Sequence, residues 1–489
     1  MALLYILLGL LGLFLALLLV AVVRAVRIKA PAPGARRESA CAPAQLDAYA
    51  RDFGALLRVQ TVSKNEDEDL SDFARFHEVL EKVFPLCAKK LERTVVRGAL
   101  LYRWAGADPG ALPILFMGHQ DVVPAQADGW TLPPYAGEVK DGRLYGRGAL
   151  DCKCNIFTQM SAVEQLLAEG FVPPCDVWLE YSINEETGGD SAPGAVRWLK
   201  EHGLRFSLVL DEGGAIIERA MPGMDRPYAV FGITEKGYID IKVKAKGNGG
   251  HSSTPPANTP VMRLAKFMTE VGRKMPFKKK LIPEVEEMFA ALAPSMGFGM
   301  RLLLGNVWLF RPLLLAAMPK VSPLGGALLA TTCTFTMMKG SDAPNVIPQE
   351  AYVVANLRTS VQQNCEQSIA ALKPIADKYG LEFEITQIRD ASPVVSTKTP
   401  VYAYLTKCVA DCFPDCGVSP YVIMGGTDCR HFHAVTDNAI RFAPLRMDAK
   451  QMESCHAIDE NVTLTAVAEA IDFYKYFVKN YQPEKKPAK

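Results

Sequence analysis

The chain opens with a long apolar segment. From Ala2 to Val23 the sequence ALLYILLGLLGLFLALLLVAVV contains no charged residue, and as a helix it would span about 30 Å of hydrocarbon. The nearest basic residues all follow the segment: Arg24, Arg27, Lys29, Arg36 and Arg37. This asymmetry predicts an uncleaved, single-pass membrane anchor with the large domain in the cytoplasm. A cleaved export signal is the alternative.

Short apolar runs alternate with amphipathic stretches between about residues 95 and 232. LPILFMGH, DVWLEYSI and FSLVLDEGG have the length and composition of buried strands, and NIFTQMSAVEQLLAEGF between the first two has that of a helix. Such alternation predicts βαβ units in an α/β domain with a mostly parallel sheet. In such sheets ligands bind beyond the carboxyl ends of the strands.

The pattern changes after Gly232. YIDIKVKAKG alternates as a strand with one solvated face, and the following elements complete a β-α-β-β-α-β order, which predicts an inserted, ferredoxin-like α+β domain. Within it, residues 279–325 are apolar and basic. Pro312 and Pro319, together with Arg301 and Arg311, argue against a second membrane span. We expect packed helices or surface association with the bilayer.

These patterns divide the chain into successive regions. We predict a transmembrane anchor (2–23), a linker (24–44), the first part of the catalytic domain (45–231), the inserted domain (232–390), the second part of the catalytic domain (391–480) and a polar tail (481–489). The formal net charge of +1 gives no electrostatic reason to expect a nucleic-acid partner. The twelve cysteines show no disulfide spacing, and we expect mostly free thiols.

Polar residues follow the predicted strands of the sheet. His119 and Asp121 in GHQD lie two residues apart, so an extended backbone directs both the same way, and a carboxylate can hold the second nitrogen of a metal-binding imidazole. Asp211 follows four apolar residues, which is a costly place for an acid without a cation. Asp151 precedes a predicted helix, where N-capping is the alternative role.

Two adjacent acids, Glu185 and Glu186 in NEETGG, repel each other unless something positive lies between them. If one binds a divalent cation and the other faces a metal-bound water, the pairing becomes favourable. The alternative is a solvated acidic loop. His456 in ESCHAIDE lies in a predicted loop, where an isolated histidine is usually a surface residue.

The motifs GHQD, GRGALD, NEETGG, LDEGG, GHSSTPP, NVIP, NLR and GGTD, followed by a late histidine, occur in this order. Together they resemble the M20 family of metallopeptidases from about residue 45 to the C-terminus. LDEGG and GHSSTPP are most similar to the branch that contains carboxypeptidase S and the N-acyl amino acid synthase/hydrolases.

The resemblance implies a site with two zinc ions, for which cobalt or manganese are possible substitutes. Asp151 would bridge the ions, His119 and Asp211 would hold one, and Glu186 and His456 would hold the other. Glu185 would be the general base, and Asp121 would orient His119. Cys152 departs from the family pattern, in which another acid usually follows the bridging aspartate.

The resemblance also makes the inserted domain a lid and a possible homodimer contact. His251 would polarise the scissile carbonyl, in many relatives from the second subunit, and Asn345 and Arg358 would hold substrate. The segment Gly425–Thr427, with Gly426 between them, would line the substrate end of the catalytic domain. After Arg358 the sequence TSVQQN replaces a Pro-Gly turn that relatives often have. This difference would affect how Arg358 is placed to grip a free carboxylate of the substrate.

Three functions follow from this reading. The first is a carboxypeptidase or dipeptidase that cleaves small peptides with a free C-terminal carboxylate. The second is an N-acyl amino acid amidohydrolase, because the same arginine and metal centre serve both reactions. The third is a non-catalytic, membrane-anchored interaction protein, which predicts the loss of a ligand or of the base.

Overall fold

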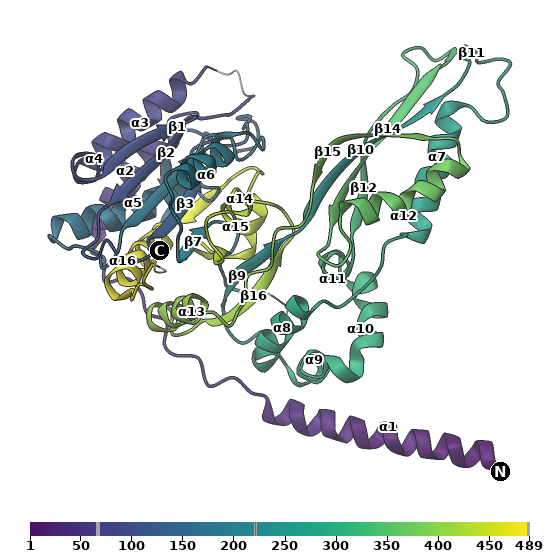
Figure 1. Cartoon of the computed structure of the whole chain (residues 1–489), viewed down its shortest axis with the longest axis horizontal. Coiled ribbons are helices and arrows are strands. Elements are labelled where there is room, and N and C mark those ends of the chain that lie inside the picture. The colour runs from purple at the N-terminus through teal and green to yellow at the C-terminus, as the bar shows by residue number, and fades with distance from the viewer. Residues whose placement is uncertain (65–68, 220, 222, 487–489) are drawn as a thin grey trace.

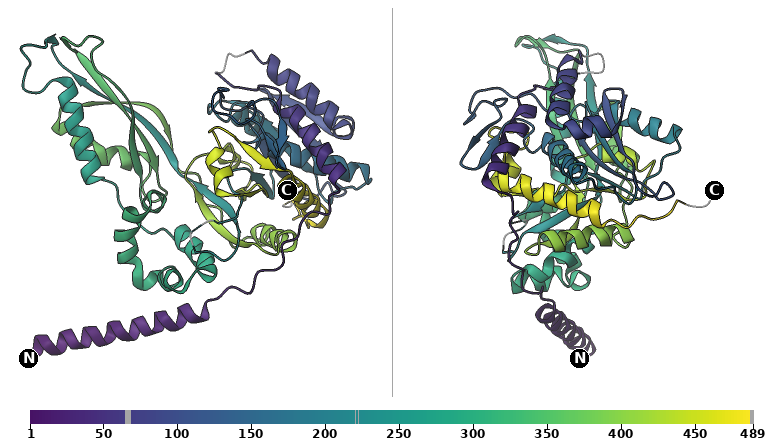
Figure 2. Two further views of the ribbon diagram at one scale, coloured as in Figure 1. Left: turned by 180° about the vertical axis from the view of Figure 1, so that it is seen from behind. Right: turned by 90° about the vertical axis from the view of Figure 1, so that its left-hand side faces the viewer.

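A computed structural model describes residues 1–64, 69–219, 221 and 223–486 (Figure 1). The N-terminal helix α1 (Ala2–Arg27) carries its leucines on the outside and extends away from the rest of the molecule (Figure 2). It is one helix that is long and apolar enough to cross a membrane, a property that signal sequences share. The extended segment after it leads to α2 (Pro43–Leu57).

The larger domain is built on a ten-stranded sheet in the order β1-β2-β6-β3-β7-β17-β9-β8-β18, with β16 beside β9. Its strands are β1 (Glu92–Val96), β2 (Ala99–Trp104), β3 (Ile114–His119), β6 (Val177–Ser182), β7 (Leu208–Asp211), β8 (Ile216–Ile217), β9 (Tyr228–Glu235), β16 (Gly417–Ile423), β17 (Ala439–Arg441) and β18 (Arg446–Met447).

The sheet is mixed, which corrects the expectation of a mostly parallel one. β6, β3, β7 and β17 are parallel at its centre, whereas β1, β2 and β6 pair antiparallel. β9 also pairs antiparallel with β17 and β8. The connection between β1 and β2 is a tight turn at Arg97 and Gly98, both with positive φ, and a turn that short joins only antiparallel strands.

Helices cover both faces of this sheet. Phe116 of β3 packs toward α5 (Lys153–Ala168) and α16 (Leu464–Asn480), where its ring lies 5.2 Å from that of Tyr474. The neighbouring Met117 points to the opposite face, in the cluster that includes α6 (Ser191–Glu201). Because alternate residues of a strand face opposite sides, a strand covered on both faces is apolar throughout.

The remaining elements of the larger domain lie around this sheet. They are α3 (Ser71–Val83), α4 (Pro85–Lys90), α13 (Pro400–Cys412), α14 (Cys429–Phe432), α15 (Ala449–Ser454) and a three-stranded sheet of β4 (Glu138–Lys140), β5 (Arg143–Tyr145) and β19 (Asn461–Thr463).

The smaller domain contains a four-stranded antiparallel sheet in the order β12-β14-β10-β15. Its elements follow one another as β10 (Gly237–Lys246), α7 (Pro260–Lys274), β12 (Thr332–Lys339), β14 (Glu350–Thr359), α12 (Cys365–Lys378) and β15 (Glu382–Arg389). Ile239, Ile241 and Val243 of β10 face the helices and are buried. The chain leaves the large sheet after Glu235 and enters β10 at Gly237.

Residues 283–329 form a group of helices at the base of the smaller domain (Figure 1). They are α8 (Pro283–Leu292), a 3-10 turn (Ala293–Ser295), α9 (Phe298–Leu304), α10 (Val307–Val321) and α11 (Pro323–Leu329). α9 and α10 meet at an angle of 100°. Each is shorter than a bilayer is thick, and the group packs around a core that includes Phe289 and Leu314.

Candidate active site

The ends of the central parallel strands bring the predicted ligands to one edge of the large sheet. His119 is the last residue of β3, Glu185 and Glu186 lie in the turn after β6, and Asp211 is the last residue of β7. Since these strands are parallel neighbours, their carboxyl ends lie side by side.

Asp151 lies at the centre of the cluster. Its Oδ1 is 3.0 Å from His119 Nε2 and its Oδ2 is 3.0 Å from His456 Nε2. His456 Nε2 is also 3.1 Å from Glu186 Oε2. The structure therefore brings together four of the five predicted ligands, and Asp151 touches both imidazoles with different oxygens.

Asp121 holds the turn that carries the adjacent acids. Its Oδ1 accepts a hydrogen bond from the Glu185 backbone N–H (3.2 Å) and its Oδ2 accepts one from that of Glu186 (3.1 Å). Ser63 Oγ donates to the same carboxylate at 2.8 Å. The acid pair is thus fixed through its backbone, which leaves both side chains free for other partners.

Asp121 also orients His119. The Nδ1 of His119 lies 2.9 Å from the Asp121 carbonyl oxygen and 3.3 Å from its Oδ1. An N–H at Nδ1 satisfies these acceptors and leaves the lone pair on Nε2, which faces Asp151. A ring held in this way presents a metal-binding nitrogen to the cluster.

The electrostatics of the cluster are unusual. Hydrogen bonds to Asp151 and Glu186 raise the pKa of His456 to about 10. Burial raises the pKa of Glu185 well above its usual range, and the nearby carboxylates of Glu212 and Asp151 raise it further against the opposing effect of His119. A raised carboxyl pKa is typical of a group that accepts and returns a proton near neutral pH.

The donor set fits a divalent metal. The ligand atoms of His119, Asp151 and Glu186 lie within 4.8 Å of one another. Glu186 Oε1 is buried and has no hydrogen-bond partner among the residues that the structure describes, a costly state that a cation would relieve. Imidazole nitrogens combined with carboxylate oxygens suit zinc.

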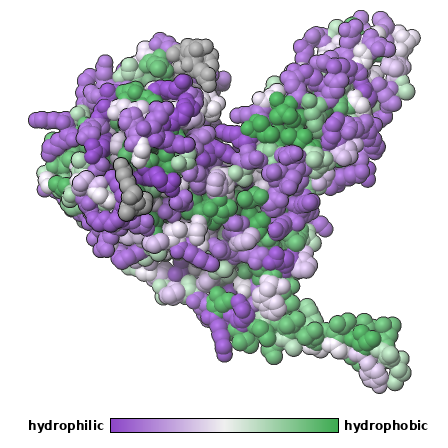
Figure 3. All heavy atoms as spheres, viewed as in Figure 1, coloured by the Kyte–Doolittle hydropathy of each residue, from purple (hydrophilic) through white to green (hydrophobic). Residues whose placement is uncertain are grey.

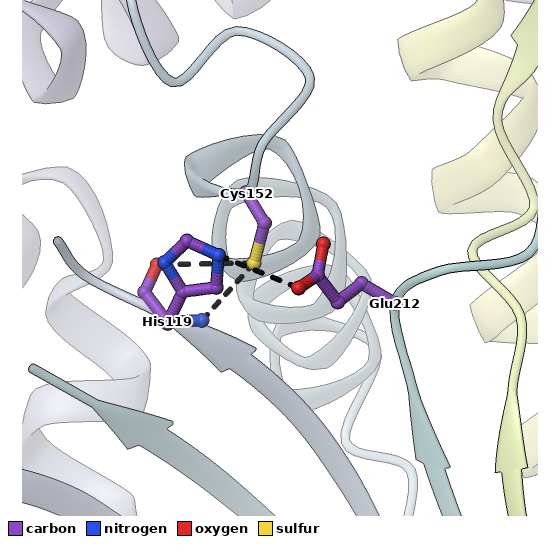
Figure 4. A group of neighbouring side chains, drawn as sticks. All are labelled: His119, Cys152 and Glu212. Atoms are coloured by element: carbon purple, nitrogen blue, oxygen red, sulfur yellow. Dashed lines mark hydrogen bonds and ion pairs between the residues drawn. The ribbon is translucent and has the colours of Figure 1, made fainter. Parts of the chain in front are cut away.

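Asp211 is not part of this cluster, which differs from the expected ligand set. Its Oδ2 accepts a hydrogen bond from the Cys429 backbone N–H at 3.0 Å, so the carboxylate faces α14. The next residue, Glu212, faces the cluster instead, with Oε1 3.4 Å from His119 Nε2 (Figure 4). Successive side chains at a strand end point to opposite sides. Asp211 and Glu212 of LDEGG therefore face different parts of the structure.

Cys152 lies on the same side of His119 as Glu212, and the possible ligand atoms of these three residues lie within 4.8 Å of one another (Figure 4). Its Sγ accepts a hydrogen bond from the His119 backbone N–H at 3.0 Å. Burial raises the pKa of this thiol well above its usual range, and its hydrogen bond supports the backbone of His119. The twelve cysteines are all free thiols.

His251 and Asn345 lie far from the cluster, at the outer end of the smaller domain (Figure 1). His251 belongs to β11 (Gly250–His251), which pairs with β13 (Val346–Ile347), and the Ser252 N–H donates to the Asn345 carbonyl oxygen at 3.0 Å. His251 is exposed, and its Nδ1 lies 2.7 Å from Ser253 Oγ. Within one chain, the structure does not bring these two residues to the cluster.

Arg358 lies near the junction of the two domains. Its guanidinium stacks on the ring of Tyr238, 4.6 Å from the centroid, and that of Arg389 contacts the same ring at 5.5 Å. The sequence did not identify Arg389, although its position at the end of β15, where the chain returns to the larger domain, was a usable signal. Its Nε is buried without a hydrogen-bond partner among the described residues.

The loop with Gly425, Gly426 and Thr427 follows β16 and lies beside a buried acid. Thr427 Oγ1 donates to Glu235 Oε1 at 3.1 Å. A Cβ on Gly426 would lie 3.1 Å from Arg430 Nη1 and 3.4 Å from Glu235 Oε2. These contacts are tight, so the two side chains would have to shift to accept a larger residue. The small residue allows the loop to pass next to this ion pair.

An apolar cavity of about 320 Å³ opens beside the cluster. It reaches Asp151 and Glu212 at one end. Most of its wall is hydrophobic, from residues such as Ile217, Val230, Tyr421, Met424 and Leu445.

The fold and the cluster together define an α/β metallohydrolase. The sequence profile of peptidase family M20/M25/M40 matches residues 115–480, and the chain belongs to this family. It is 32% identical over 433 residues to the probable carboxypeptidase S-like 2 of Dictyostelium discoideum, covering 86% of this chain and 82% of that one. It is 29% identical over 441 residues to the N-fatty-acyl-amino acid synthase/hydrolase PM20D1 of Homo sapiens, covering 88% and 87%.

Solved structures share the fold. The M20 family metallo-carboxypeptidase Sso-CP2 from Sulfolobus solfataricus superposes with a TM-score of 0.65 at 18% identity, covering 88% of this chain and 98% of that one. Human carnosine dipeptidase 1 gives a TM-score of 0.59 at 16% identity, covering 88% and 96%. The chain is thus an M20-type metallopeptidase or amidohydrolase, and the predicted enzyme class and family are confirmed.

Proposed function

We propose that this enzyme hydrolyses an amide bond in a small peptide whose product bears a free α-carboxylate. The observation that carries the proposal is the convergence of His119, Asp151, Glu186 and His456 around one point at the edge of the large sheet, with Glu185 next to Glu186 in the same turn. This arrangement supports a site for two zinc ions, which Asp151 would help to hold because it contacts both imidazoles. When bound, the ions would supply Lewis acidity that makes a water nucleophilic and polarises a carbonyl.

The residues of the chain would divide the chemistry as follows. Glu185 accepts the proton of the attacking water and then delivers it to the nitrogen of the leaving amine, so that the C–N bond breaks without releasing an anionic amine. Asp121 keeps Glu185 and His119 in position through the hydrogen bonds described above. Glu212 takes the ligand place expected for Asp211, because its carboxylate is the one that faces His119.

The smaller domain would act as a lid that grips the substrate. Arg358 can bind a carboxylate through two parallel hydrogen bonds, and Arg389 on the same tyrosine ring adds positive charge there. β11, which contains His251, lies at the outer end of the smaller domain, away from the larger domain (Figure 1). We infer that His251 reaches the scissile carbonyl of a second subunit in a homodimer, as an electrophile for the developing oxyanion.

The second candidate is hydrolysis of N-acyl amino acids. The apolar cavity beside Asp151 and Glu212 favours it, because a hydrocarbon chain placed there would leave its amide at the cluster. Val230 of the cavity wall belongs to the same hydrophobic core as the helices of residues 283–329, and Tyr421 and Met424 pack against that core. The curated PM20D1 relatives are synthase/hydrolases of N-fatty-acyl amino acids.

We also propose that α1 anchors the enzyme in a membrane, with the catalytic domain in the cytoplasm. The basic residues Arg24 and Arg27 at the end of α1 support this orientation. Ala21 and Ala25 of α1 are fully buried against the rest of the chain, so removal of α1 would expose the surface that covers them. A reporter fused after Lys489 should be active only in the cytoplasm, and activity in an exported compartment would favour the signal-sequence alternative.

The function is tested with the full-length protein, stripped by a chelator and reloaded with zinc, cobalt or manganese. Unmodified dipeptides and N-fatty-acyl amino acids are compared as substrates by release of the free amine. Glu185→Gln should lower turnover by about 10³-fold with unchanged metal content, whereas the exposed Glu138→Gln should leave both unchanged. Full activity of Glu185→Gln would remove the assigned base.

A further inference from the structure

Helix α10 exposes an apolar face to solvent. Trp308, Pro312 and Ala316 are spaced by four residues, and Leu313 lies on the same side of the helix. All four are exposed, Trp308 and Leu313 to 46% and 51%. The opposite side, with Val307 and Leu314, is buried in the core of the helical group. A soluble helix normally has the reverse arrangement, with its polar side outward.

The neighbouring helix α9 extends this surface. Phe298 and Met300 are exposed to 46% and 38%. Residues 298–321 contain no acidic residue, and their charged side chains are Arg301, Arg311 and Lys320. Exposed apolar side chains with a tryptophan and only basic charges are typical of a surface that meets a bilayer with anionic lipids.

The corner between α9 and α10 holds the end of α1. Asn306 Nδ2 donates to the Ala21 carbonyl oxygen at 3.0 Å, and Arg301 Nη1 donates to the Ile28 carbonyl oxygen at 3.4 Å. The side chains of Ala21 and Ala25 are covered, while the preceding part of α1 is exposed (Figure 3). A membrane that contains α1 therefore lies next to the exposed faces of α9 and α10.

The dimensions favour a position in the plane of the membrane. α10 has 15 residues, so it is about 22 Å long and too short to cross the hydrocarbon. Arg311 near its middle pairs with Glu286 of α8, which fixes one side of the helix to the protein. An amphipathic helix held in this way buries its apolar face at the boundary between headgroups and acyl chains.

We propose that the exposed face of α9 and α10, defined by Phe298, Met300, Trp308, Leu313 and Ala316, docks on the bilayer that α1 spans. The docking surface rests on the membrane anchor proposed above, and goes beyond it by fixing how the catalytic domain sits on the membrane. With two attachments, α1 and this surface, the domain cannot rotate freely about its linker. The wall of the substrate cavity is continuous with these helices, so the surface also keeps the cavity side of the enzyme at the membrane.

The test uses tryptophan quenching in the full-length protein. The chain is placed in nanodiscs of phosphatidylcholine and phosphatidylserine, either ordinary or brominated in the upper acyl chain. The other tryptophans, Trp104, Trp130, Trp178 and Trp198, lie in the larger domain. The difference between wild type and Trp308→Phe therefore reports Trp308 alone, and bromination should reduce this signal by roughly twofold.

A paired variant tests the face itself. Leu313→Glu should abolish most of the quenching of Trp308, whereas Val172→Glu, at an exposed valine of the larger domain, should leave it unchanged. Equal Trp308 emission in ordinary and brominated discs, with the chain still bound to the discs, would overturn the docking surface but not the anchor. Contact of Trp308 with a second copy of the chain instead of lipid would likewise overturn the docking surface but not the anchor. A chain that does not remain with the discs would overturn the anchor, and the docking surface with it.

Discussion

The candidate metal cluster and the outer end of the smaller domain differ in how many contacts hold their candidate functional residues in place. In the cluster, His119 and Asp151 are held by several hydrogen bonds, and the turn with Glu185 and Glu186 is fixed through Asp121. At the outer end, His251 is exposed, and its side chain bonds only to Ser253 among the described residues. The first region is organised within one chain, whereas the role proposed for His251 requires a second subunit.

This difference has a consequence for mutations. Changes in the cluster should remove the metal or the base, and no other chain can restore them. Changes at the outer end should leave metal content and folding intact and should be rescued by a partner that supplies the missing side chain. The predictions below test that contrast.

The largest effect is expected for a ligand that contacts two carboxylates. His456→Ala should lose at least one metal ion and lower turnover by at least about 10³-fold, which corresponds to about 4 kcal/mol of transition-state stabilisation. Metal content by mass spectrometry and turnover are measured together. The exposed His202→Ala is the matched control. Two tightly held ions in His456→Ala would contradict the ligand assignment.

The next effect separates the two acids of LDEGG. Glu212→Gln should release the ion beside His119, because its carboxylate faces that imidazole. Asp211→Asn keeps an oxygen for the Cys429 N–H and should retain metal, with a loss of stability of about 1–3 kcal/mol at most. Metal content and the denaturation midpoint distinguish the variants. The opposite result would return the ligand role to Asp211.

A smaller effect is expected at the outer end of the smaller domain. His251→Ala should lower turnover by about 10²-fold with unchanged metal content, as for the loss of one oxyanion donor. Co-expression with Glu185→Gln should recover about a quarter of wild-type activity, because a mixed dimer contains one complete site. If the mixture stays inactive although mixed dimers form, His251 does not act across a subunit boundary.

The smallest effect concerns substrate binding. Arg358→Ala should raise KM by about 10-fold for a substrate with a free carboxylate and should not affect its C-terminal amide. Arg389→Ala should behave in the same way if both guanidinium groups on Tyr238 serve the carboxylate. The exposed Arg273→Ala is the control. An equal loss with both substrates would assign these arginines to packing.

Sequence patterns predicted the parts of the fold that depend on local periodicity. The buried strand ending in His119 and the alternating strand at residues 237–246 lie where their patterns placed them. The antiparallel edge of the large sheet was not predicted. The direction of a strand depends on which strands pair, and the sequence of one strand does not specify its neighbours.

The candidate site shows a similar division. The order of motifs identified His119, Asp151, Glu186 and His456, which the structure brings together. It could not decide between Asp211 and Glu212, because both follow the same strand and only the backbone direction at its end selects one. Asp121 was expected to orient His119. Its hydrogen bonds to the backbone of Glu185 and Glu186 were not predicted, because they join segments that are distant in the sequence.

The central claim is that one cluster of five side chains holds two cations. The most direct measurement is anomalous diffraction at the zinc edge from crystals of the zinc-loaded enzyme. We expect two peaks about 3.5 Å apart, bridged by Asp151, with His119 and Glu212 at one and Glu186 and His456 at the other. Peaks elsewhere in the molecule, or none at this cluster, would contradict the account.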